Sequence, residues 1–376
     1  MVQPPNVSLE TSVSRSAAFK YCFVLFLAYR CIGAIPFLTL TSLLSFVIPH
    51  LFRTNDDPVE RRKLMNNWKD REVKVFSGDD EIDVREEYVV NKRAMCLMST
   101  TMRPLRRPIK AVLCFCHGYA DNPYNLTRWA YRLLVYAGYA MVILEYEGHG
   151  RSDGLLGFIP SWDLLVDDAV THFRNVLKKE RDFRQKKCFL VGESMGGAVC
   201  FSSYLKCPNF WDGIIFVAPM CKISEEVKPP QWVIDLLLKI IGPSGSINFF
   251  GKLPLSPSSD YDELIFKDKL VLQAFREVPT AYNRKPRLAT ARELLNATDM
   301  IGNNLSKMRA RFLVLHGKDD IVTCPALSQA LYSEAASKDK TIKLYDNMNH
   351  AITGGECKQQ IEKVFQDMIG WLDDRI

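Results

Sequence analysis

The stretch GESMG, residues 192–196, places a serine between two glycines. It follows the apolar run CFLV and precedes the helical pattern AVCFSSYL. A G-x-S-x-G sequence between a strand and a helix is typical of a sharp turn that exposes a nucleophilic serine. The N–H groups and the positive dipole end of the following helix would face that serine. We therefore predict that Ser194 is a nucleophile.

A serine hydroxyl needs a neighbouring base to become nucleophilic at neutral pH. The chain has six histidines. His350 follows the last expected strand, at 342–345, and precedes the last expected helix, so its loop can lean over the carboxyl edge of a sheet. His117, His149 and His316 each precede a glycine, and for these we expect structural roles. His350 is the predicted base.

The base needs an orienting carboxylate, and two aspartates compete for that role. Asp319 and Asp320 lie side by side after the expected strand FLVLHG. Adjacent side chains after a strand point in different directions, so at most one can face the imidazole of His350. The residues alone leave the choice between the two aspartates open.

Acyl transfer also needs two donors for the oxyanion. One is expected to be the backbone N–H of Met195, directly after the nucleophile. The second should come from the loop after the first core strand, HGYADN, where Gly118 allows a close approach. The predicted donor in that loop is the N–H of Tyr119.

These residues must be positioned by strands and helices that alternate along the chain. Continuous apolar runs are typical of buried parallel strands. Helical patterns such as 165–176 and 361–372 lie between or after them. We predict an α/β fold with a mostly parallel central sheet and helices on both faces. The apolar runs are 109–116, 139–146, 187–192, 213–219 and 311–317.

The alternation stops at about 220–310, which we interpret as an inserted helical cap. Within it, QWVIDLLLKII carries polar residues only at Gln231, Asp235 and Lys239. These positions form one narrow stripe, so the helix is expected to be buried or to face lipid.

The N-terminal part has a different composition. We predict a tail at 1–20, a membrane anchor at 21–53, a polar linker at 54–70 and the catalytic domain at 71–376. From residue 31 to residue 49 no side chain is charged, which is about the length that crosses a hydrocarbon core, roughly 20 residues. A cleaved signal peptide, a buried helix and a hairpin-like, non-spanning insertion are the alternatives. Two β-like runs around the turn SGDD also predict a hairpin at the start of the catalytic domain.

Composition excludes several classes of protein. The net charge is only +6, and no dense Lys/Arg stripe suggests a nucleic-acid partner. The eleven cysteines include no C-x-x-C pair, so we expect a reduced protein. No HExxH, GxGxxG or P-loop motif is present, and the sequence predicts neither a metal nor a cofactor.

Taken together, these stretches resemble the monoacylglycerol lipase family of α/β-hydrolases, with an S33-type hydrolase domain. The plant branch, which includes caffeoylshikimate esterase-like proteins, is the most similar. The resemblance implies Ser194, Asp320 and His350 as the triad, because the family pattern G-x-x-D-x-V, which begins at Gly317, places its aspartate at Asp320. It differs at Glu145, where the family usually has an aspartate. The matching stretches are HGYADN, EYEGHGRSDG, GFIPSWDLLVDD, GESMGGAV, WDGIIFVAPMCKI, PRLATARELL and LVLHGKDDIVT.

The resemblance implies a serine ester hydrolase that cleaves monoacylglycerol to a fatty acid and glycerol. Lysophospholipids and phenolic esters of the caffeoylshikimate type are alternative substrates. An acyltransferase, or a membrane scaffold with an inactive site, would be a different class of protein. A lipid substrate and an anchor at 21–53 together predict residence at an endomembrane such as the endoplasmic reticulum.

Overall fold

The computed structural model describes residues 54–376, apart from 77–80, 122–130, 222–230, 246–249 and 255–264. Contacts divide the chain into Met1–Arg53 and Thr54–Ile376, and the elements named below all belong to the second unit. The expected tail at 1–20 and anchor at 21–53 lie outside the described residues. None of the helices that the structure describes is both long and apolar enough to cross a bilayer.

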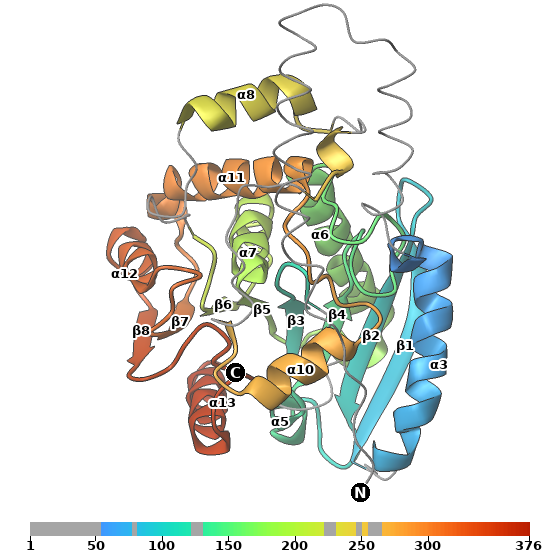
Figure 1. Ribbon diagram of the computed structural model, residues 1–376. Coiled ribbons are helices and arrows are strands. Elements are labelled where there is room, and N and C mark those ends of the chain that lie inside the picture. Colours follow the sequence, from blue (N-terminus) through green and yellow to red (C-terminus); the bar gives the residue numbers. More distant parts are fainter. Residues whose placement is uncertain (1–53, 77–80, 122–130, 222–230, 246–249, 255–264) are drawn as a thin grey trace, which may run out of the picture. The chain divides into compact units, whose positions relative to one another are not determined.

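An eight-stranded sheet runs through this unit in the order β1-β2-β4-β3-β5-β6-β7-β8 (Figure 1). β1 pairs with β2, and β2 with β4, in antiparallel fashion. Every later pair in this order, from β4–β3 to β7–β8, is parallel. The expected mostly parallel sheet is confirmed. The strands are β1 Ile82–Val90, β2 Cys96–Pro104, β3 Val112–Cys116, β4 Ala140–Leu144, β5 Cys188–Glu193, β6 Gly213–Val217, β7 Phe312–Gly317 and β8 Lys340–Tyr345.

Helices cover both faces of the sheet, because alternate side chains of each strand point to opposite sides. In β3, Cys114 and Cys116 belong to the core shared with α6 and α7. Leu113 and Phe115 belong to the opposite core, shared with α5 and α13. Besides η1 Thr54–Asp56 and α3 Pro58–Phe76, the helices outside the insertion among the described residues are α5 Arg132–Tyr136, α6 Trp162–Lys179, η2 Arg181–Phe183, α7 Met195–Lys206, α12 Pro325–Glu334 and α13 Lys358–Asp373.

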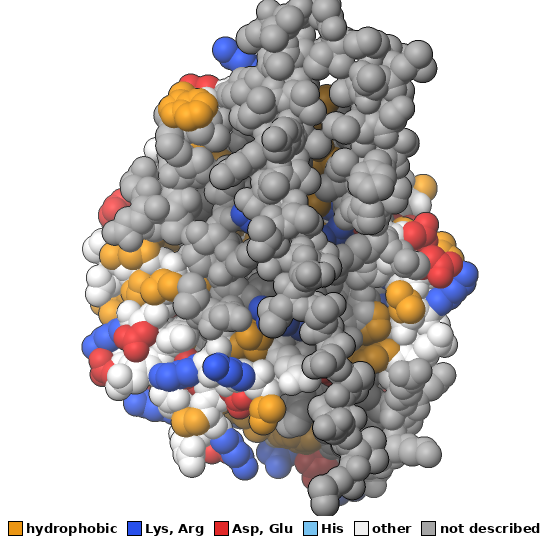
Figure 2. Space-filling model, viewed as in Figure 1, with side chains coloured by type: hydrophobic (Ala, Val, Ile, Leu, Met, Phe, Trp, Pro, Cys, Tyr) orange, Lys and Arg blue, Asp and Glu red, His pale blue; other side chains and the backbone are white. Residues whose placement is uncertain are grey.

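The described part of the insertion between β6 and β7 is largely helical, and α8 lies alongside α11 (Figure 1). Ile234 and Ile241 of α8 are buried, but Trp232 is 69% exposed and Leu238 is 37% exposed. Hydrophobic side chains accordingly show at the outer end of this helix (Figure 2). The elements are α8 Gln231–Ile241, η3 Phe250–Lys252, α10 Lys269–Glu277, α11 Leu288–Gly302 and η4 Leu305–Lys307.

The hairpin expected around residues 77–80 is wrong. Its first arm is the end of helix α3, Pro58–Phe76, and β1 pairs with β2 instead. Residues 54–70, expected as a linker, hold the short helix η1, Thr54–Asp56, and most of α3.

Tertiary contacts explain why this segment is ordered and helical. Arg61 is fully buried, and its guanidinium donates to the carbonyls of Gly150, Ser152 and Gly154 at 2.9, 2.6 and 3.1 Å. One turn later, Met65 packs in a small core with residues 278 and 281 of the insertion. Neither contact is visible as a local pattern in the sequence.

Candidate active site

Ser194 lies in the turn between β5 and α7, with backbone angles φ 55° and ψ −119°. A non-glycine residue at positive φ is uncommon and costly, so the surrounding structure must hold it there. Two hydrogen bonds do so: Ser194 N donates to Val217 O at 3.0 Å, and Met220 N donates to Ser194 O at 2.9 Å. The end of β6 therefore fixes the turn from both sides.

The two glycines of the motif are required by close packing. A Cβ at Gly196 would lie 1.8 Å from the carbonyl oxygen of Cys116, and one at Gly192 would lie 2.4 Å from the carbonyl oxygen of Gly196. Helix α7 thus approaches β3 and the turn more closely than any side chain at these positions permits. This explains the motif in terms of the fold.

The structure brings Asp320 and His350 together. His350 Nδ1 donates to Asp320 Oδ2 at 2.7 Å, and both residues are buried. Asp319, by contrast, is exposed. Of the two aspartates between which the sequence left the choice open, the structure therefore places Asp320 beside His350. The family spacing selects the same residue.

Asp320 is held by donors on both oxygens. The backbone N–H groups of Val322 and Thr323 donate to Oδ1 at 2.8 and 3.0 Å. Thr323 Oγ1 and His316 Nε2 donate to Oδ2, alongside His350, at 2.8 and 3.0 Å. His316 also places its Nδ1 2.7 Å from the hydroxyl of Ser328. The structural role expected for His316 is thus a specific one, because it helps to orient the carboxylate.

These contacts set the charges of the pair. Burial acts to raise the pKa of Asp320, but His350 and His316 outweigh it and hold that pKa well below its usual range. Burial acts to lower the pKa of His350, and the charge and hydrogen bond of Asp320 outweigh it and raise that pKa. The arrangement favours an ionised aspartate beside a histidine that gains a proton readily.

His350 also has the tautomer that a base requires. An ionised Asp320 can only accept a hydrogen bond, so the proton lies on Nδ1 of His350. This leaves the lone pair of Nε2 available. Neither this nitrogen nor the Ser194 hydroxyl makes a hydrogen bond within the described residues. Such bonds are often long in ligand-free sites. The catalytic roles of Ser194, Asp320 and His350 therefore stay predictions, supported by the geometry of two of the three.

The loop after β3 lies against the nucleophile turn, since a Cβ on Gly118 would be 3.5 Å from the Cβ of Ser194. His117 Nδ1 donates to the Gly118 carbonyl at 2.8 Å. The C=O and N–H of one trans peptide point in opposite directions, so this bond also fixes the direction of the Tyr119 N–H. Met195 is the first residue of α7, where backbone N–H groups lack partners within the helix.

The sequence did not single out Glu193, directly before the nucleophile. Its buried carboxylate accepts from Thr353 Oγ1 at 2.6 Å and from the Tyr131 hydroxyl at 3.0 Å. Burial raises the pKa of Glu193, which hydrogen bonds and the charge of His350 partly oppose. Thr353 lies in the His350 loop, so Glu193 ties that loop to the nucleophile turn. In the sequence, the one feature that could have indicated this role is that Glu193 places a charged residue inside the G-x-S-x-G motif.

Glu145, which departs from the family pattern, is buried against Arg151. The Arg151 Nη2 donates to Glu145 Oε1 at 2.6 Å, and the backbone N–H of Arg151 donates to Oε2 at 2.5 Å. The carboxylate thereby closes the loop after β4.

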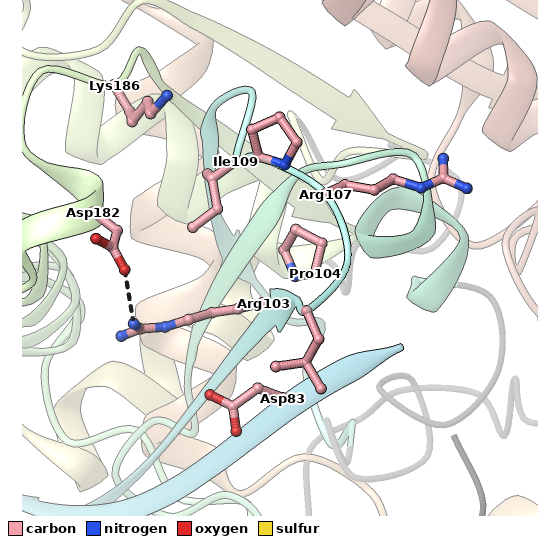
Figure 3. A pocket seen from close by; sticks show the side chains of 9 residues that line it. Asp83, Arg103, Pro104, Arg107, Ile109, Asp182 and Lys186 are labelled. Carbon is pink, nitrogen blue, oxygen red and sulfur yellow. Dashed lines mark ion pairs between the residues drawn. The ribbon is translucent and has the colours of Figure 1, made fainter. Parts of the chain in front are cut away.

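A separate hollow of about 480 Å³ lies at the amino ends of the parallel strands, away from Ser194 (Figure 3). Arg103 at the end of β2 reaches Asp182 there, with 3.7 Å between Nη1 and Oδ2. Lys186 and Ile109 lie just before β5 and β3, at the amino ends of these strands. The hollow is therefore distinct from the Ser194 turn, which follows the carboxyl end of β5.

The mostly parallel sheet has the α/β-hydrolase fold, and the family and relatives given next show a serine ester hydrolase. The chain belongs to the family described as serine aminopeptidase, S33, whose model matches residues 107–357.

Similar proteins include esterases and lipases. The caffeoylshikimate esterase of Arabidopsis thaliana is 31% identical over 288 residues, which cover 74% of this chain and 82% of the esterase. The human monoglyceride lipase is 24% identical over 289 residues, covering 77% of this chain and 90% of the lipase. The structure of a soluble variant of the Saccharomyces cerevisiae monoglyceride lipase has a TM-score of 0.63 at 20% identity, and the match covers 78% of this chain and 97% of that one.

Proposed function

We propose that the protein hydrolyses monoacylglycerols to a fatty acid and glycerol through an acyl-enzyme on Ser194. The observation that carries this proposal is the buried Asp320–His350 pair in a chain whose relatives include monoglyceride lipases. The first step is attack of the Ser194 hydroxyl on the ester carbonyl, while His350 Nε2 takes its proton. Asp320 stabilises the imidazolium that forms.

The remaining steps use the same groups. The N–H groups of Tyr119 and Met195 stabilise the tetrahedral oxyanion. The ester bond breaks, and His350 returns its proton to the glycerol oxygen as glycerol leaves. Water, deprotonated by His350, then attacks the acyl-enzyme and releases the fatty acid.

The insertion supports a lipid substrate. Trp232 and Leu238 expose apolar surface on α8, and exposed apolar surface on an amphipathic helix favours contact with a lipid interface. Lysophospholipids share this property, so they remain a substrate to be compared.

The test is a substrate panel on the wild-type protein and on Ser194→Ala. A fluorophosphonate probe first establishes whether Ser194 is reactive. We expect long-chain monoacylglycerol to be hydrolysed faster than a lysophospholipid of the same chain and faster than caffeoylshikimate. Full hydrolysis by Ser194→Ala would contradict the mechanism, and transfer of the acyl group to an added alcohol in place of water would indicate an acyltransferase.

A phenolic ester is the second candidate, and one observation favours it. The caffeoylshikimate esterase is 31% identical to this chain, against 24% for the human lipase. If caffeoylshikimate is turned over with the higher kcat/KM, the substrate assignment changes and the roles of the triad do not.

We also propose that residues 21–53 hold the protein at an endomembrane. The support is the run from residue 31 to residue 49, which has no charged side chain and about the length of a spanning helix, roughly 20 residues. Alkaline carbonate extraction of membranes tests this. The full chain should stay in the pellet, and a chain of residues 54–376 should be released. Release of both would contradict the anchor.

A further inference from the structure

Asp56, the last residue of η1, forms buried ion pairs with two arginines of the insertion. It is 5% exposed, and its Oδ1 accepts from Arg287 Nη2 at 2.8 Å and from Arg284 Nη2. Arg287 is fully buried and also donates to the carbonyl of Leu156 at 2.8 Å. Two guanidinium groups therefore share one carboxylate oxygen in a buried site.

The guanidinium groups of the same two arginines also lie against one aromatic ring. The guanidinium carbons of Arg284 and Arg287 lie 5.0 and 5.6 Å from the ring centre of Tyr282. Tyr282 is buried, and its hydroxyl donates to the carbonyl of Lys285 at 2.8 Å. Cation–π contacts of this kind are stronger where they are desolvated, so the position of the ring depends on the arginines.

Tyr282 in turn packs against the predicted oxyanion loop. Its ring lies edge-on to that of Tyr119, with 6.0 Å between centres. The Tyr119 hydroxyl donates to the carbonyl of Gly157 at 2.9 Å, and Thr290 of α11 donates to the same carbonyl at 3.0 Å. A Cβ on Gly157 would lie 2.6 Å from the Tyr282 ring. The side chain of Tyr119 thus contacts Tyr282 and Gly157, and the two arginines that Asp56 neutralises contact Tyr282 in turn.

We propose that Asp56 is a positioning residue for the loop that carries Tyr119, and that it acts through the Tyr282 ring. Without the negative charge, two adjacent guanidinium groups would repel each other in a buried site. Tyr282 would then lose its support, and the backbone N–H of Tyr119 would move relative to the reacting carbonyl. Asp56 lies outside the residues that the family model matches, 107–357. The inference rests on the proposed role of Tyr119 as an oxyanion donor.

The test compares Asp56→Asn with Asp57→Asn in the full chain. Asp57 is the neighbouring residue, is exposed, and accepts from the N–H groups of Val59 and Glu60 at the start of α3, which asparagine also does well. The readouts are the rate constant for labelling by a fluorophosphonate, kcat and KM for p-nitrophenyl butyrate, and the melting temperature.

We expect Asp56→Asn to lower the labelling rate and kcat by about tenfold or more, with KM changed less than about twofold, because oxyanion alignment acts on the transition state. Asp56→Glu should recover most of the loss, and Asp57→Asn should match the wild type. If Asp56→Asn is folded at the assay temperature and labels at the wild-type rate, the proposal is wrong and Asp56 is only structural.

A second pair of variants decides the question if Asp56→Asn does not fold. Tyr282→Leu removes the ring and should lower the labelling rate, whereas Tyr282→Phe keeps the ring and should not. Equal rates for these two variants would overturn the proposal. A wild-type protein that is labelled but does not cleave monoacylglycerol would remove the proposed substrate only, since the ratios of labelling rates would still decide the role of Asp56.

Discussion

Asp320 and Asp319 are adjacent in the chain and opposite in environment. Asp320 is buried and bonded to His350, and Asp319 is exposed. We predict that Asp320→Asn lowers kcat by about 1,000-fold to 10,000-fold, because the amide cannot stabilise the imidazolium and favours the wrong tautomer. Asp319→Asn should stay within about threefold of the wild type, as surface substitutions usually do. Steady-state kinetics on a soluble ester measure both, and the reverse order would move the orienting role to Asp319.

Glu193 gives a prediction about pH. Its negative charge acts, after that of Asp320, to raise the pKa of His350. Glu193→Gln removes this charge, so the pKa of His350 should fall. The base is active when neutral, and the acidic limb of the kcat/KM profile should therefore move to lower pH.

The control for this prediction is Thr353→Val. It removes the hydrogen bond to Glu193 and leaves the carboxylate in place. The acidic limb should not move to lower pH in this variant. An unchanged profile in Glu193→Gln would contradict the prediction.

At the scale of elements, the sequence predicted the strands of the parallel sheet well, because buried strands are continuous apolar runs. It also predicted the nucleophile turn, because the glycines at 192 and 196 that mark the motif are the residues that the close packing requires. It failed at α3, where charged and β-branched residues alternate as in a strand. The helix depends on the burial of Arg61 and Met65 against distant segments, and no local pattern reveals such contacts.

Helix α7 and helix α13 offer a matched test of glycine in helices. A Cβ at Gly196 would lie 1.8 Å from a backbone oxygen of β3, whereas one at exposed Gly370 meets nothing within 4 Å. Gly196→Ala should destabilise the protein by about 1–3 kcal/mol or more, because the helix must shift. Gly370→Ala should stabilise it by about 0.5–1 kcal/mol. Urea unfolding measures both, and a neutral Gly196→Ala would contradict the close approach.

For the whole molecule, the N-terminal boundary of the folded unit is open to test. We predict that residues 54–376 fold as the full chain does, since this range contains η1 and α3. A chain that begins at residue 69 lacks Arg61, and the carbonyls of Gly150, Ser152 and Gly154 lose its donors. Its free energy of unfolding should fall by about 3 kcal/mol or more, at about 1 kcal/mol or more for each unpaired carbonyl. Equal unfolding midpoints would show that α3 is dispensable.

The pairing of Asp56 with Arg287 also sets an order of events during synthesis. The two residues are 231 positions apart, and a ribosome that adds about 5–20 residues per second makes the arginine about 10–50 s after the aspartate. Until residues 278–287 are made, Asp56 and Met65 lack the partners in the insertion described above. The contact between Asp56 and Arg287 closes one of the longest loops among the described residues, so we expect it to form late. Its residues are then expected to be exposed to proteases and chaperones for most of translation.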